Sequence, residues 1–332
     1  MAKPTIITLL GAATALVLAV PAQARLVYVK SAKNGDPRVF VAGDDGTGAH
    51  RIGMGERPRV SPDGRWVAWI VPGDTQQLMM RLADRSRKAR VVARSSLFGD
   101  VQFSPDSKLL AFDESRRLFA YDIHGRETVK AASGSIRGFS FSPDSGSIAF
   151  GTSGRNDAVD APADLYSFDL ADRTRRRITR DRKSLNPLWG TNGIIHDRQR
   201  SRAGDAPSYN LFEIQPDGGS LRRITKLRIP SLMSGLMPIE LSGDGKRLLA
   251  GFVGQDLEVG FRVNPATGSA HALGKFSESG FVGADLSADG KTVLGHTGGA
   301  DPSNGHNVVT MPYGGGKQKV LVKGAFDPDW NR

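Results

Sequence analysis

The fold is decided by a stretch that reads Val60-Ser61-Pro62-Asp63-Gly64, then Arg65, then Trp66-Val67-Ala68-Trp69. Proline presets φ at the first central position of a turn, aspartate bonds neighbouring backbone amides, and glycine accepts the positive φ that closes the turn. The apolar residues on both sides read as two paired strands. The stretch therefore predicts a β-hairpin.

The same pattern recurs along the chain. Clear copies lie around Ser104 and Ser142, and weaker copies lie around Gly190, Ser242 and Ser287. Measured from the serine at 61, the steps between copies are 43, 38, 48, 52 and 45 residues. This period is the length of a four-stranded β-propeller blade.

The two ends of the chain complete one repeat between them. Residues 26–53 hold three expected strands without a leading hairpin, and residues 325–330 repeat the start of the pattern and then stop. We expect the C-terminal strand to pair with the N-terminal blade and close the ring. The sequence thus predicts an all-β, seven-bladed propeller; six blades is the alternative, because the copy at 190–193 is degenerate.

The N-terminus reads as a signal peptide. Lys3 supplies the positive start, residues 5–20 are apolar, and residues 21–24 offer a small-x-small cleavage pattern. We expect cleavage after Ala24, which gives a signal peptide over 1–24 and one propeller domain over 25–332. The apolar stretch is too short to span a bilayer, so we expect no stable membrane insertion after cleavage and a periplasmic or secreted protein.

Composition narrows the choice of partners. The formal net charge is +11, and removing residues 1–24, whose only charged side chain is Lys3, leaves +10 on 308 residues. Anionic partners are therefore favoured, but a signal peptide argues against nucleic acid. The absence of cysteine means that packing and hydrogen bonds stabilise the fold.

The repeats resemble those of the TolB-like family of propeller proteins. The resemblance rests on the Ser-Pro-Asp-Gly hairpins, the Arg-Ile-Thr stretches at 177–179 and 223–225, and the closing Pro-Asp-Trp at 328–330. It covers residues 26–330 and implies the fold and a preference for protein partners. The chain departs from TolB itself, which carries an α/β domain before a six-bladed propeller, so the resemblance transfers no particular partner to any residue.

Other side chains point to structure more than to chemistry. One aspartate recurs in each hairpin, as at Asp63 and Asp106, which is typical of turns and not of a paired acid and base. The six histidines are scattered and are expected in loops or at the surface, and we expect no metal and no cofactor. Arginine-rich runs at 85–88, 173–177, 180–183 and 198–202 suit edge-strand protection or, alternatively, binding of an anionic polymer.

The architecture itself suggests a binding site. The loops that enter the innermost strands surround one mouth of the channel, where ligands of propellers commonly bind. The candidate binding residues on or just before these strands are Arg59, Asp100, Arg137, Asn186 and Asp285.

These observations favour a binding protein over an enzyme. The sequence has no Gly-x-Ser-x-Gly elbow of the kind that propeller-linked serine peptidases need. We expect a noncatalytic, monomeric scaffold for a protein or peptide of the cell envelope or the extracellular space. A module that binds glycans or anionic polymers is the alternative, and a metal-dependent polysaccharide lyase is a more distant one.

Overall fold

The computed structural model describes residues 25–331, apart from 33–34, 157, 159–160, 201–207, 231–232, 255–256, 278–279, 288 and 300–304. The expected signal peptide, residues 1–24, lies outside the described residues. The described part of the chain forms strands and turns without a helix, as the all-β prediction requires. It accordingly holds no helix long and apolar enough to cross a membrane.

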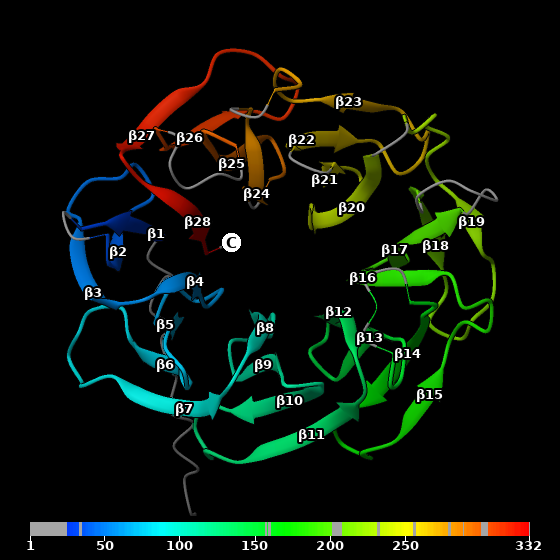
Figure 1. Ribbon diagram of the computed structural model, residues 1–332, viewed down its shortest axis with the longest axis horizontal. Coiled ribbons are helices and arrows are strands. Elements are labelled where there is room, and N and C mark those ends of the chain that lie inside the picture. Colours follow the sequence, from blue (N-terminus) through cyan, green and yellow to red (C-terminus); the bar gives the residue numbers. More distant parts are fainter. Residues whose placement is uncertain are drawn as a thin grey trace, which may run out of the picture.

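Four of the sheets have four antiparallel strands that follow one another in sequence. The innermost strand of each comes first and the outermost comes last, and the sheets stand around a central axis (Figure 1). Their strands are β4 (Glu56–Val60), β5 (Trp66–Val71), β6 (Gln76–Leu82) and β7 (Arg90–Ser95); β8 (Phe98–Phe103), β9 (Leu109–Glu114), β10 (Arg117–Asp122) and β11 (Thr128–Ser133); β12 (Ile136–Phe141), β13 (Ser147–Thr152), β14 (Asp164–Asp169) and β15 (Arg175–Arg177); β24 (Val282–Leu286), β25 (Thr292–Thr297), β26 (Asn307–Pro312) and β27 (Lys319–Lys323).

An eight-stranded sheet joins two more four-stranded units. Its strands are β16 (Ser184–Gly190), β17 (Gly193–Arg200), β18 (Ser208–Ile214) and β19 (Arg222–Arg223), then β20 (Met233–Leu241), β21 (Leu248–Gly254), β22 (Glu258–Val263) and β23 (Ala270–Ala272). A parallel pairing between Tyr209 of β18 and Gly235 of β20 links the units. The predicted count of seven blades requires that the eight-stranded sheet be counted as two blades, divided at this bridge. The degenerate copy of the pattern is a hairpin, since Gly190 pairs with Gly193.

The remaining sheet is built from both ends of the chain. It has the order β28 (Phe326–Trp330), β1 (Arg25–Ser31), β2 (Pro37–Gly43) and β3 (His50–Met54). β28 pairs antiparallel with β1, with Trp330 opposite Leu26, as expected for the C-terminal strand. Asn331 ends this strand as Ser61 ends β4: its side-chain oxygen accepts the Arg25 N–H at 2.6 Å, as Ser61 Oγ accepts the Trp66 N–H at 2.9 Å.

The hairpin aspartates have the predicted structural role. In the first copy Ser61 Oγ donates to Asp63 Oδ1 at 2.5 Å, and the same carboxylate accepts the Arg65 N–H at 3.0 Å. The bonds recur between Ser104 and Asp106 and in the later hairpins. One consequence is a low pKa: hydrogen bonds from its own turn lower the pKa of Asp289 to about 2.

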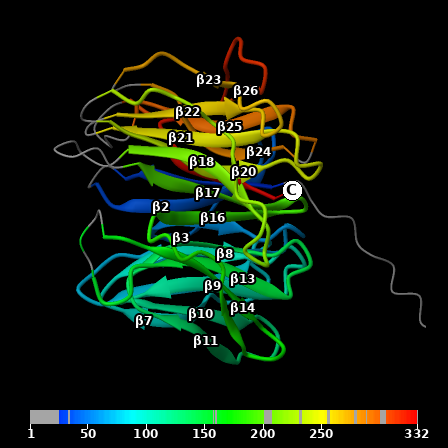
Figure 2. The same ribbon diagram turned by 90° about the vertical axis from the view of Figure 1, so that its right-hand side faces the viewer.

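The apolar core lies between neighbouring sheets, not within one. Ile70 and Leu78 of one sheet pack with Leu110 and Phe112 of the next, and all four are buried. Clusters of this kind recur between other neighbours along the ring. In the side view the strands run across the thickness of the ring (Figure 2). Packing sheet against sheet leaves the inner edge of the ring to polar side chains.

Candidate binding channel

The innermost strands carry a β-bulge at a recurrent position. The register of pairing to the next strand shifts between Glu56 and Arg59 in β4, and equivalent shifts occur in β8, β12, β16 and β24. Several residues at the bulges adopt a left-handed backbone, among them Arg57 (φ 51), Asn186 (φ 42) and Asp327 (φ 51). An extra residue in one strand re-aims its side chains. The innermost strands, which carry these bulges, stand around the middle of the ring (Figure 1).

A cavity of about 890 Å³ lies among the innermost strands. Each innermost strand contributes one residue to this cavity at the same offset. The residue lies two positions before the serine of the hairpin turn, or two positions before the residue that takes the place of this serine. We call this set the channel ring; it comprises Arg59, Gln102, Ser140, Leu188, Glu240, Asp285 and Asp329.

Charge is unevenly distributed around the channel ring. Glu240, Asp285 and Asp329 come from the consecutive innermost strands β20, β24 and β28, whereas Gln102, Ser140 and Leu188 on the other side are uncharged. Arg59 on β4 stands next to the acidic side. The channel is therefore acidic on one side although the protein as a whole is strongly basic.

Arg59 is surrounded by carboxylates. Its guanidinium lies 3.7 Å from an oxygen of Asp100 and 3.9 Å from one of Asp327. Burial acts to lower the pKa of Arg59, but attraction to Asp329, Asp100, Asp327 and Asp285 outweighs it and raises the pKa. Arg59 therefore stays charged at any ordinary pH.

The buried acids of the channel ring hold their protons more tightly than free aspartate. Burial raises the pKa of Asp329 to about 6, with Asp327 and Asp100 adding repulsion. Burial and the charge of Asp329 raise the pKa of Asp285 well above its ordinary value. Near neutral pH the acidic side would gain from a cation that replaces lost hydration.

Channel-ring residues also tie neighbouring strands together. Asp329 Oδ2 accepts the backbone N–H of Val60 at 2.7 Å, and Ser140 Oγ accepts that of Trp189 at 2.7 Å. Gln102 Nε2 donates to the carbonyl oxygen of Phe139 at 2.9 Å. These contacts give the channel ring a structural role, so its substitution would affect stability.

Four of the five candidate binding residues line the cavity: Arg59, Asp100, Asn186 and Asp285. Arg137 is not among the lining residues. It precedes the left-handed Gly138 at the bulge of β12, and its guanidinium donates to the carbonyl oxygen of Ala158 instead. Sequence reasoning missed Gln102, Ser140, Glu240 and Asp329. The constant offset from the turn serine was the signal that would have found them.

The histidines depart in part from the expected surface positions. His124 and His271 are exposed, but His196 on β17 is completely buried, and burial lowers its pKa to about 4. It lies opposite Phe212 of β18, and its neighbours Ile195 and Asp197 on β17 are buried as well. His296 and His306 lie together, with 3.3 Å between their Nδ1 atoms. Within the described residues, no group of three or more His, Asp or Glu could hold a metal ion.

Known proteins were compared with this chain in sequence and in structure. No protein-family model matches the chain, and no curated protein matches it. Several solved structures do match the chain. TolB from Acinetobacter baumannii has a TM-score of 0.56 and 17% identity over 92% of this chain and 82% of that one. The β-propeller domain of the Trilobed protease from Pyrococcus furiosus has a TM-score of 0.66 and 12% identity over 90% and 92%.

The chain has a TolB-like β-propeller fold. An oligogalacturonate lyase in complex with manganese is also similar, with a TM-score of 0.61 and 13% identity over 91% of this chain and 86% of that one. Because propellers with such different tasks match equally well, the fold does not select among functions. The function of this propeller has to be argued from its own channel and surface.

Proposed function

We propose that this propeller is a noncatalytic scaffold of the periplasm or the extracellular space, and that it binds a protein or peptide partner at its central channel. The observation that carries the proposal is the channel ring, which places Glu240, Asp285 and Asp329 together beside Arg59 in a cavity of about 890 Å³. The predicted signal peptide supports export.

The charge of the cavity specifies the kind of group that enters it. Glu258, Asp100 and Asp327 line the same cavity, and Arg59 is the one arginine among the lining residues. A lysine or arginine side chain of the partner, or its amino terminus, would find carboxylates of β20, β24 and β28 together with apolar contact from Trp189 of β16 and Met237 of β20. Aromatic and methionine contacts of this kind are common in protein interfaces.

A matched pair of methionine variants tests the site. Met237 on β20 lines the cavity and is 37% exposed, while Met54 on the outermost strand β3 is 45% exposed. Neither change disturbs a buried side chain. We expect Met237→Lys to abolish binding of a cationic peptide or of a partner purified by affinity capture, because the added charge repels it. Met54→Lys should leave binding unchanged.

A charge-reversed variant separates electrostatics from shape. Met237→Glu adds a side chain of similar size to the same position and should preserve or strengthen binding of the cationic peptide. Equal loss in the lysine and glutamate variants would mean that shape, not charge, governs the channel. If Met54→Lys lost binding as fully as Met237→Lys, the partner site would have to lie elsewhere.

A further inference from the structure

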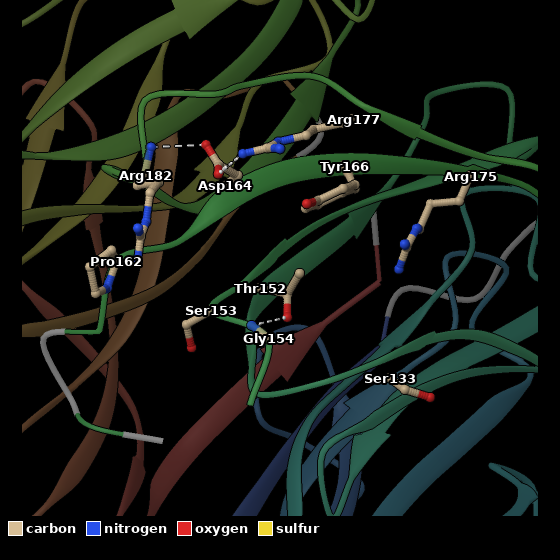
Figure 3. Close-up of a pocket in the computed structure, with 10 residues that line it drawn as sticks. All are labelled: Ser133, Thr152, Ser153, Gly154, Pro162, Asp164, Tyr166, Arg175, Arg177 and Arg182. Atoms are coloured by element: carbon tan, nitrogen blue, oxygen red, sulfur yellow. Dashed lines mark hydrogen bonds and ion pairs between the residues drawn. The ribbon is translucent and has the colours of Figure 1, made fainter. Parts of the chain in front are cut away.

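A second hollow lies at the rim of the ring, away from the channel ring. This rim groove has a volume of about 520 Å³ and is lined by residues of β11, β13, β14 and β15 and of the loops beside them (Figure 3). Its charged side chains are Arg175, Arg177, Arg182 and Asp164. The volume falls within the range of sites for small ligands.

The aspartate of the rim groove is already engaged. Asp164 is 5% exposed, and its Oδ2 accepts a hydrogen bond from Arg177 Nη2 at 2.6 Å. Its Oδ1 accepts from Thr179 Oγ1 at 3.0 Å and from the Arg182 N–H at 2.9 Å. This carboxylate therefore orients Arg177 and the loop that carries Arg182, and it offsets the charge of one arginine.

The other two arginines have their charges available. Among the described residues, neither Arg175 nor Arg182 forms an ion pair, and both are exposed. Arg175 is held over the ring of Tyr166, with its guanidinium carbon 5.1 Å from the ring centroid. Figure 3 shows these side chains around the groove, with the hydroxyl groups of Ser133 and Ser153 on its other side. The groove thus presents a surplus of positive charge.

The next blade repeats the scaffold but lacks the counterpart of Arg175. There Asn210, Thr225 and Arg223 take the places of Asp164, Thr179 and Arg177, and Thr225 Oγ1 donates to Asn210 Oδ1 at 2.9 Å. The position of Arg175 is occupied by Leu221. The strand can therefore form without an arginine at this position. Edge protection needs only exposed charge, and does not account for arginines from strand and loop that line one hollow.

We propose that the rim groove binds the sulfate or carboxylate groups of an acidic polysaccharide. Guanidinium groups pair with such oxyanions through two parallel hydrogen bonds, and serine hydroxyls can bond the hydroxyls of a sugar. This inference is independent of the protein partner proposed for the channel.

The test compares two double variants that remove the same charge. Arg175→Gln/Arg182→Gln removes the free arginines of the groove, whereas Arg173→Gln/Arg176→Gln removes neighbours outside it. Arg176 alternates to the other face of β15 and donates to the carbonyl oxygen of Asp217. Calorimetry with heparin and with hyaluronan should show affinity reduced about tenfold or more in the first variant, since charge-assisted bonds are lost, and nearly unchanged affinity in the second.

Three results would overturn the proposal. The first is an equal loss in the two double variants, which would mean that net charge alone attracts the polymer. The second is that neutral dextran binds as well as heparin and hyaluronan, or that no polysaccharide binds. The third is that vesicles of phosphatidylglycerol bind more tightly than either acidic polysaccharide and compete with it, which would assign the groove to a membrane surface. Circular dichroism and thermal unfolding check that the variants are folded.

Discussion

The backbone N–H of Val60 donates a hydrogen bond to Asp329 Oδ2 across 269 residues of sequence, at 2.7 Å. It joins the last strand of the chain to the innermost strand of the following sheet. The same strand is held on its other side, where Trp330 Nε1 donates to the carbonyl oxygen of Leu286 at 3.0 Å. The C-terminal strand is thus fixed to the sheets on both sides of it.

Replacing Asp329 should reveal what this bond contributes. Asp329→Ala leaves the Val60 N–H without its acceptor, and we expect the free energy of unfolding to fall by about 1–3 kcal/mol. Asp329→Asn keeps an acceptor oxygen and should cost less. Urea denaturation of the purified variants measures the difference. Equal stability of the two variants would mean that this hydrogen bond does not explain the presence of aspartate at position 329.

Asp197 predicts a pH dependence of stability. Its Oδ2 accepts from Asn186 Nδ2 at 3.0 Å, Oδ1 has no partner within the described residues, and burial raises the pKa to about 7. In the unfolded chain the carboxyl ionises near its ordinary value of 3.8, so the folded state binds more protons between these limits. Its contribution to stability is therefore favourable at low pH and is lost as pH rises from about 4 to about 7.

Asp197→Asn removes this titration while keeping an acceptor for Asn186. We expect the variant to gain stability relative to the wild type as pH rises through this window, by about 1.4 kcal/mol for each pH unit at most. Asp289→Asn is the control, because the pKa of Asp289 is lowered to about 2 and this carboxylate does not titrate there. A constant difference between Asp197→Asn and the wild type at all pH values would contradict the raised pKa.

Ser107 links two hairpins at the cost of backbone strain. It stands where three other copies have Gly64, Gly245 and Gly290, and it has φ 61, while its Oγ accepts the Asp63 N–H of the preceding sheet at 3.0 Å. Ser107→Ala loses the bond and keeps the strain, whereas Ser107→Gly loses the bond and relieves the strain. We expect the alanine variant to be the less stable of the two by about 1 kcal/mol in urea denaturation. The opposite order would mean that the backbone at this position is unstrained.

The predicted export can be tested by identifying the N-terminal residue of the natural protein. If residues 1–24 are a signal peptide, mass spectrometry of protein recovered from the periplasm or the medium should show a chain that begins at Arg25. Changing Ala22 and Ala24 to bulky residues should block cleavage and retain the longer chain. Recovery of a chain that still begins at Met1 from those compartments would contradict the prediction.

The hairpins could be predicted from the sequence because their signals are local. Asp63 and Asp106 act within a few residues of themselves, and the same turn chemistry recurs in each copy. Asn331 shows the limit of this reasoning. It takes the place of the turn serine by accepting the N–H of Arg25, which a search for Ser-Pro-Asp-Gly does not find.

The sites were harder to predict because they combine distant segments. Arg137 lies five positions before Ser142 and outside the channel, whereas Ser140, two positions before that serine, lines the cavity. The rim groove joins Ser133 of one sheet with Arg175 and Arg182 of the next. The channel ring has a constant offset from the turn serine, but the contact between sheets that forms the rim groove leaves no mark in the spacing of its residues.

The pairing of β28 with β1 also constrains the order in which the molecule can form. The hairpins elsewhere join neighbours in sequence and can form as soon as their residues leave the ribosome. The bond from the Arg25 N–H to Asn331 spans 306 residues, so the first sheet stays without its innermost strand until residues 326–331 have been synthesised. Joining the ends restricts the whole intervening chain and costs entropy that only the finished contacts repay. Assembly of the ring is therefore expected to be late and slow, and loss of residues 326–331 would leave the inner edge of β1 unpaired.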